Sequence, residues 1–173
     1  MLEYVIRDVQ SVLHFFPYGA AAGSIVLCIA VLRNAGRKLI GKEPVAVAPQ
    51  VCFYMYLAIL LSITLLSRES GTGQGRIDLE LFSTWRINTR NRAYLIENIL
   101  LFMPYGCVCA WKWERCRRFA GCAAVGIFTS VIIECIQLFG RRGVFQLDDI
   151  LTNVLGCMLG WMIWRLFLRG FLT

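Results

Sequence analysis

Two segments of the chain space their carboxylate, amide and hydroxyl side chains so that a helix would gather them on one face. Ser130, Glu134 and Gln137 lie at positions i, i+4 and i+7, and Asp149 and Asn153 repeat the first interval. At about 100° per residue these positions form a narrow stripe. A carboxylate in such a stripe could act as a general base, or bind a sugar hydroxyl or an amine while the amides orient the ligand.

A third segment carries a stripe of the same kind. Asn98, Phe102 and Tyr105 lie at i, i+4 and i+7, so an amide would stand in line with two aromatic rings. Pro104 interrupts this helix and leaves the carbonyl four residues earlier without its donor. We predict that the proline kinks the helix and opens a pocket lined by Glu97 and Asn98.

The composition indicates that the elements carrying these stripes cross a lipid bilayer. Hydrophobic residues make up 58% of the 173 residues, charged residues only 17%, and the mean hydropathy is +0.62. A spanning helix needs roughly 20 mainly apolar residues. Strands would leave backbone groups unpaired in lipid, so we predict an all-α fold, a polytopic transmembrane helix bundle in a single domain over residues 1–173. The five predicted spans are about 12–32, 51–66, 93–111, 119–139 and 150–168.

The basic residues favour one orientation in the membrane. If the N-terminus is outside, ten of the 18 lysines and arginines fall on the cytoplasmic side, accompanied by only Glu43 and Glu114. Cytoplasmic loops are typically enriched in Lys and Arg. We therefore predict an external N-terminus, a cytoplasmic C-terminus and contact of the basic surplus with the anionic lipid of the bilayer.

With this topology the polar stripes converge on the extracytoplasmic side. Arg68 at the end of the second span and Asp148 before the fifth join them, together with one of Arg141 and Arg142. Arg141 continues the stripe if the fourth helix persists, while Gly140 could end that helix first. Ionisable groups within a membrane are costly and usually functional. The simpler interpretation is that Gln137, Asn153 and their neighbours only tie helices together, and Gly156 and Gly160 favour close helix packing.

Other classes of site have weaker support. The eight cysteines lie almost entirely inside predicted spans and none has metal-ligand spacing beside a histidine, so we expect neither a metal nor a cofactor. His14 is the only histidine and is more typical of an interfacial residue. No basic stripe with interleaved aromatics occurs outside the spans, and we expect no nucleic-acid partner.

In order, the motifs resemble those of the VanZ-like family of bacterial membrane proteins. The resemblance rests on Asn98 followed by LFMPYG, on Ser130 with IECIQ, and on RRGVFQLDDILTNVLG from Arg141 to Gly156. It covers roughly residues 68–161. Gln146 replaces a frequent acid, and residues 77–82 read IDLELF where many members have an Asn-Leu-x-Pro-Phe patch. The resemblance implies a protein of the bacterial plasma membrane and an association, in some members, with resistance to the lipoglycopeptide teicoplanin.

The polar cluster leaves three functions open. In the first, an outward-facing site binds a lipid-linked or acylated envelope molecule, with Arg68 and Arg141 or Arg142 meeting anionic groups and Phe102 and Tyr105 meeting an acyl chain. In the second, the protein is an intramembrane enzyme acting on envelope lipid or glycopeptide, with Glu134 or Asp149 as general base. In the third, it is a membrane scaffold. The candidate ligand-binding residues are Arg68, Asn98, Phe102, Tyr105, Ser130, Glu134, Gln137, Arg141, Arg142, Asp148, Asp149 and Asn153.

Overall fold

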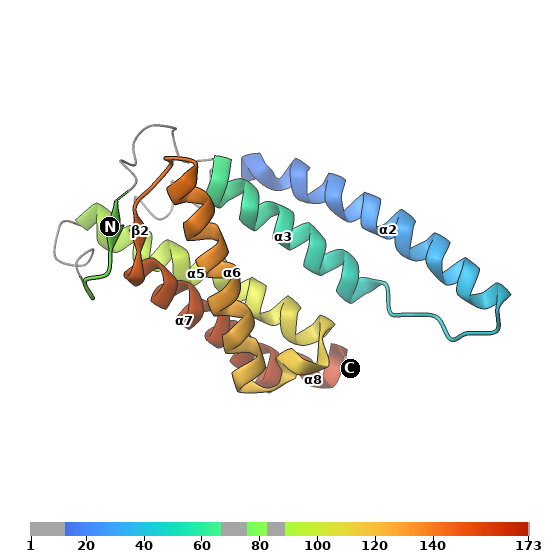
Figure 1. Cartoon of the computed structure of the whole chain (residues 1–173). Coiled ribbons are helices and arrows are strands. Elements are labelled where there is room, and N and C mark those ends of the chain that lie inside the picture. The colour runs from blue at the N-terminus through green and yellow to red at the C-terminus, as the bar shows by residue number, and fades with distance from the viewer. Residues whose placement is uncertain (1–12, 67–75, 83–88, 173) are drawn as a thin grey trace.

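The computed structural model describes residues 13–66, 76–82 and 89–172, and within them the protein is a bundle of long helices (Figure 1). Five helices within these residues are long and apolar enough to cross a membrane, as predicted. The elements are η1 (Leu13–Phe15), α2 (Phe16–Leu39), α3 (Ala48–Leu66), β1 (Ile77–Asp78), α5 (Thr89–Lys112), η2 (Glu114–Arg117), α6 (Phe119–Phe139), β2 (Phe145–Gln146), α7 (Leu147–Ile163), the π-helical segment η3 (Trp164–Leu168) and α8 (Arg169–Leu172).

The predicted spans agree most closely with the helices where the apolar stretch ends sharply on both sides. The fourth span, 119–139, matches α6 at both ends. The first helix instead continues to Leu39, because residues 33–39 are polar but still helical, and an apolar window detects only the lipid-soluble part. The helix α7 begins at Leu147, three residues before the predicted start.

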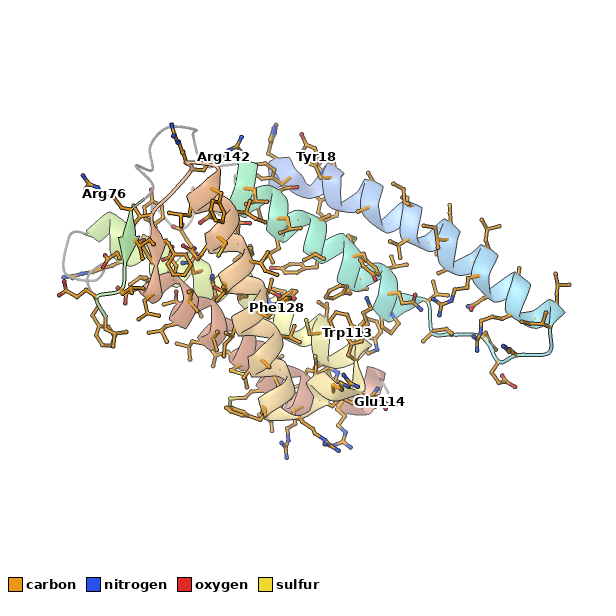
Figure 2. All side chains as sticks on the ribbon, in the orientation of Figure 1. Tyr18, Arg76, Trp113, Glu114, Phe128 and Arg142 are labelled. Atoms are coloured by element: carbon orange, nitrogen blue, oxygen red, sulfur yellow. The ribbon has the colours of Figure 1, made fainter. Side chains whose placement is uncertain are left out.

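Successive long helices run in opposite directions, so their ends gather at two levels (Figure 1). We call the level where α3 and α6 finish and α5 and α7 begin the cluster end, and the other the opposite end. Arg142 lies at the cluster end and Trp113 and Glu114 at the opposite end (Figure 2).

The helices α5 and α7 are joined by a close crossing of backbones. A Cβ atom added at Gly156 would lie 2.3 Å from the carbonyl oxygen of Ile99, and one at Gly160 would lie 1.8 Å from that of Met103. Gly106 of α5 approaches α7 in the same way. The predicted packing role of Gly156 and Gly160 is therefore confirmed.

The first two helices form a hairpin at the side of the bundle. Gly19 and Gly23 of α2 are buried against Ile59 and Met55 of α3, and the Asn34 side chain exchanges two hydrogen bonds with the backbone of Val45 in the connecting loop. Much of the rest of α2 presents exposed apolar side chains, as expected for a face in contact with lipid.

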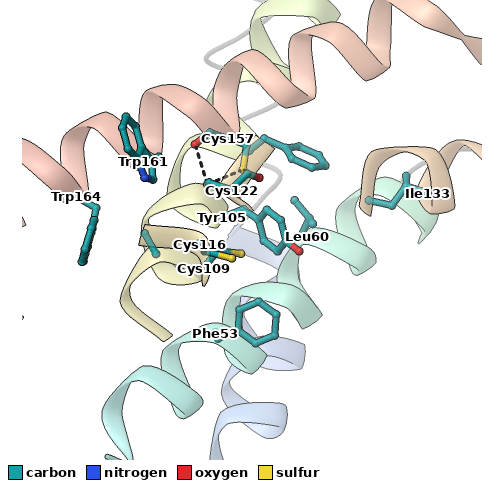
Figure 3. Packing of buried hydrophobic residues seen from close by; sticks show 12 residues of the cluster. Phe53, Leu60, Tyr105, Cys109, Cys116, Cys122, Ile133, Cys157, Trp161 and Trp164 are labelled. Carbon is teal, nitrogen blue, oxygen red and sulfur yellow. Dashed lines mark hydrogen bonds between the residues drawn. The ribbon is translucent and has the colours of Figure 1, made fainter. Parts of the chain in front are cut away.

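The core lies where α3, α5, α6 and α7 meet. Phe102 and Tyr105 of α5 are buried in it. Phe53 and Leu60 from α3 belong to the same cluster as Tyr105, and so do Cys122 from α6 and Cys157 from α7 (Figure 3). The thiols of Cys122 and Cys157 are free and their sulfur atoms are 3.6 Å apart. Near the opposite end, burial raises the pKa of the Cys116 thiol in η2 to about 11.

Candidate functional site

The polar stripes of α6 and α7 are buried inside the bundle at the cluster end. Glu134 and Gln137 are each 1% exposed, and Asp149 is 3% exposed. Ser130 and Asn153 are buried with them. The helical period therefore places these side chains against neighbouring helices and away from lipid, as the spacing predicts.

Ser130 and Asn153 connect the two stripes directly. The Asn153 amide nitrogen Nδ2 donates a hydrogen bond of 2.8 Å to Ser130 Oγ. An amide is not a base, so this contact does not activate the serine hydroxyl as a nucleophile. The other amide atom, Asn153 Oδ1, is buried and has no hydrogen-bond partner within the described residues.

Glu134 meets the start of α7 through a short pair of strands. The backbone N–H of Gln146 donates to Glu134 Oε2 at 3.1 Å. Strand β2 pairs in parallel with β1, with Asp78 opposite Gln146, so the segment before α5 covers this part of the cluster. Asp148 extends the cover, because its Oδ1 accepts the backbone N–H of Phe82 at 2.7 Å.

The end of α3 is held by one side chain from the last turn of α6 and one from the segment that follows it. Gln137 Nε2 donates to the Thr64 carbonyl at 2.9 Å, and the Arg142 guanidinium donates to the Leu65 carbonyl. These carbonyls belong to the last turn of α3, where helix geometry leaves acceptors free. Gln137 Oε1 is buried without a hydrogen-bond partner in the described parts of the chain.

The structure distinguishes Arg142 from Arg141. The helix α6 ends at Phe139 with Gly140 as its C-cap, and Arg141 is exposed with a φ of 52°. The stripe of α6 consequently does not continue to Arg141, and Arg142 is the arginine that returns to the bundle. Arg68 lies outside the described residues.

The third stripe divides between the core and the cluster. Phe102 and Tyr105 are 0% and 2% exposed, and the Tyr105 hydroxyl shares a 2.7 Å hydrogen bond with Thr129 Oγ1. Both rings therefore pack in the core and do not line the pocket described next. Asn98 Nδ2 is buried, and no described residue accepts a hydrogen bond from it.

Pro104 lies inside a helix that is continuous from Thr89 to Lys112. The Tyr56 hydroxyl of α3 donates a 2.6 Å hydrogen bond to the carbonyl of Leu101, next to the Leu100 carbonyl that Pro104 leaves without its helical donor. The helix is thus supported from α3 at this point, while the predicted kink stays a prediction.

An apolar pocket opens between α5 and α7 beside the polar cluster. It has a volume of about 420 Å³ and is lined by Leu95, Ile96, Ile99, Leu151 and Thr152, with Phe82 and Asp148 also on its wall. Asp148 therefore belongs to both the cluster and the pocket. Sequence reasoning missed the aliphatic residues, because on an apolar helix nothing in their type separates a pocket wall from a lipid-facing surface.

Comparison with known proteins identifies the family. The VanZ/LLP1 family model matches residues 53–168, about two thirds of the chain. The chain belongs to the VanZ/LLP1 family. No curated protein and no solved structure matches it significantly.

The VanZ/LLP1 match includes all the described polar residues of the cluster, from Asn98 to Asn153, and the apolar pocket from Leu95 to Thr152. It begins within α3 and omits α2, the helix whose packing glycines face α3. The VanZ/LLP1 region is thus the part of the bundle that builds the site.

Proposed function

We propose that this VanZ/LLP1 protein binds an acylated or lipid-linked envelope molecule at its cluster end. The observation that carries the proposal is the apolar pocket of about 420 Å³ whose wall includes the buried carboxylate residue Asp148. A pocket for a small amphiphile combines an apolar lining with a few placed polar groups. Here Leu95, Ile99 and Leu151 would contact an acyl chain.

The polar cluster offers hydrogen bonds to the head group of such a ligand. Asn98 Nδ2 is a buried donor, and Asn153 Oδ1 and Gln137 Oε1 are buried acceptors, each without a hydrogen-bond partner among the described residues. Leaving such a group unsatisfied costs about 1–3 kcal/mol. A sugar or glycopeptide presents both donors and acceptors, so its binding would recover part of this cost. Glu134 and Asp149 add carboxylates for hydroxyls or amines.

The proposal includes the position of the site in the cell. We propose that the protein lies in the bacterial plasma membrane with the cluster end outside, because the lysine and arginine count favours that orientation. A C-terminal green fluorescent protein fusion should then fluoresce, and a C-terminal alkaline phosphatase fusion should be inactive. The reverse pattern would place the cluster in the cytoplasm and contradict an envelope ligand on the outer side.

Teicoplanin, a glycopeptide with an acyl chain, is the probe for the first test. We expect a sensitive bacterial host expressing the wild-type chain to be protected against teicoplanin more than against vancomycin, which lacks that chain. Membrane levels would be matched by immunoblot. Equal susceptibility of expressing and non-expressing cells would contradict the proposed ligand class for this member.

Two tryptophan variants on α7 separate the pocket from the lipid-facing surface. Leu151→Trp would fill the pocket and should remove the protection. Leu155→Trp lies one turn further along α7, is 50% exposed and is not on the pocket wall, so it should retain the protection. Equal effects of the two variants would exclude the pocket as the acyl site.

Glu134→Gln tests the polar half of the site, and recovered drug tests its chemistry. Glutamine keeps the size and can still accept from the Gln146 N–H, but removes the charge, so we expect reduced protection with normal membrane levels. Mass spectrometry should recover teicoplanin unchanged if the site only binds. Recovery of a hydrolysed or modified drug would instead support an enzyme with Glu134 or Asp149 as general base.

A further inference from the structure

A second pocket lies at the opposite end of the bundle and has an entirely different lining. Its volume is about 410 Å³, and it is bordered by Arg117, Arg118, Arg165 and Arg169 with the rings of Phe119 and Trp164. Two arginines precede α6 and two lie on the last turns after α7, so segments distant in sequence form one site. None of the described residues that line it is an aspartate or a glutamate.

The N-terminus of α6 lies at this basic pocket, because Arg118 and Phe119 are both on its wall. Arg118 is the N-cap residue in extended conformation, and no side chain caps the helix. The first intrahelical bond joins Cys122 N–H to the Arg118 carbonyl, so the earlier N–H groups have no acceptor within the helix. N–H groups without a helical acceptor and the positive end of the helix dipole together favour an anion such as phosphate.

Aromatic rings hold two of the arginines in place. The guanidinium carbon of Arg117 lies 5.9 Å from the ring centre of Trp164, and that of Arg165 lies 5.1 Å from the ring centre of Trp161. Trp161 Nε1 also donates to the Arg117 carbonyl at 3.2 Å. Arginines fixed in this way lose less conformational entropy when they bind an anion.

We propose that this arginine pocket binds a phosphate group, either in the head group of an anionic phospholipid or as free phosphate. Phosphate has the charge and the bidentate geometry that arginine recognises best. Phe119 on the pocket wall is 61% exposed, and Leu166 and Phe167, which lie between Arg165 and Arg169 in the sequence, are each 67% exposed. We expect these side chains to contact the acyl chains of a lipid. The site is separate from the polar cluster and does not depend on the function proposed for it.

Native mass spectrometry of the full-length protein in detergent micelles would test the site. Phosphatidylglycerol, phosphatidylcholine and inorganic phosphate would be titrated separately, and the apparent affinity of the first bound molecule measured. Phosphatidylglycerol has a free anionic phosphodiester, whereas in phosphatidylcholine the phosphate is neutralised within the head group. Tight binding of phosphatidylglycerol with weak binding of inorganic phosphate assigns the site to lipid, and the reverse assigns it to the free ion.

The variant is Arg118→Gln/Arg165→Gln, which removes one arginine from each side of the pocket. We expect its affinity for the preferred phosphate ligand to fall about 10- to 30-fold, from the contribution of each surface arginine. The control is Arg33→Gln/Lys38→Gln, which removes two cations near the end of α2, outside the pocket. It should bind as the wild type does.

Three results would overturn the proposal. The arginine variant binding as tightly as the wild type would exclude the pocket. Equal losses in the variant and the control would show general surface attraction without a site. Equal affinity of the wild type for phosphatidylglycerol and phosphatidylcholine, with no binding of inorganic phosphate, would exclude recognition of the phosphate charge. Thermal unfolding of both variants would verify that each remains folded.

Discussion

The substitution Gly160→Ala should separate α5 from α7, because the two backbones touch at this residue. The added Cβ would lie 1.8 Å from the Met103 carbonyl oxygen and 3.1 Å from the backbone nitrogen of Cys107. Real Cβ contacts are essentially never shorter than 3.0 Å, so the helices must part by about 1.2 Å at this point. Both atoms are backbone, and no side chain can rotate away to make room.

The expected loss of stability follows from two opposing effects. Overpacking in a well-packed interior costs about 1–3 kcal/mol, and a backbone clash belongs at the upper end of that range. Alanine gains about 1 kcal/mol over glycine in helix propensity. The separation also weakens the 2.9 Å hydrogen bond from the Cys107 thiol to the Gly160 carbonyl. We therefore expect Gly160→Ala to lower the free energy of unfolding by about 2 kcal/mol.

Unfolding in mixed micelles with increasing sodium dodecyl sulfate, followed by tryptophan fluorescence and circular dichroism, would measure this loss. Gly36→Ala is the matched control, since nothing lies within 4 Å of the Cβ position at Gly36. The control should be as stable as the wild type or slightly more stable, from helix propensity alone. If Gly160→Ala were as stable as Gly36→Ala, the close crossing of α5 and α7 would be refuted.

Three further predictions follow from the contacts of the other elements. Arg142→Met should destabilise the protein by about 1.5–3 kcal/mol, because it removes a charged donor from the carbonyl at the end of α3. Arg141→Met, at an exposed position, should change stability by less than about 0.5 kcal/mol. Equal effects in the micelle unfolding assay would contradict the assignment of Arg142 as the arginine that contacts α3. Ser130→Ala should lower the free energy of unfolding by about 1–3 kcal/mol yet retain teicoplanin protection, because Asn153 Oδ1 stays available. Asn153→Leu should lose both stability and protection. If both variants retained protection, Asn153 would be removed from the ligand site. The raised pKa of the Cys116 thiol favours folding below pH 9, and this contribution should disappear as pH rises from 9 through 11. The free energy of unfolding of Cys116→Ser should therefore decline less than that of the wild type over this range. Parallel pH curves for the two proteins would contradict the burial of the thiol.

The helical elements were predictable because their periodicity and apolar length are local properties of the sequence. Ser130, Glu134 and Gln137 of α6, and Asp149 and Asn153 of α7, all lie on buried faces as the 3.6-residue period requires. The stripe fails at Arg141 because Gly140 ends the helix, and a period holds only as long as its helix. A possible stop at glycine was visible in the sequence, but the return of Arg142 to α3 depends on tertiary contacts.

The strands β1 and β2 were not predictable from local patterns. Each has only two residues, and the whole of α5, η2 and α6 separates the partners in the sequence. They join through backbone atoms, as does the contact from Gln146 to Glu134, which uses the N–H that any residue except proline would provide. The replacement of an acid by Gln146 therefore leaves this particular contact intact, although the side-chain type suggested a change at the site. A prediction from side-chain identity has no access to a bond made by the backbone.

The same polar residues can hold the bundle together and bind a ligand, because each amide has two ends. Asn153 uses Nδ2 to join α6 and α7, and Gln137 uses Nε2 to hold α3, while Oδ1 and Oε1 remain buried and unsatisfied within the described chain. A cluster selected only for packing gains nothing from such acceptors, since an apolar side chain of similar size avoids their cost. One end of each amide thus has a structural role that the free end does not share. This difference, next to an apolar pocket, is the physical reason to look for a ligand at the cluster end.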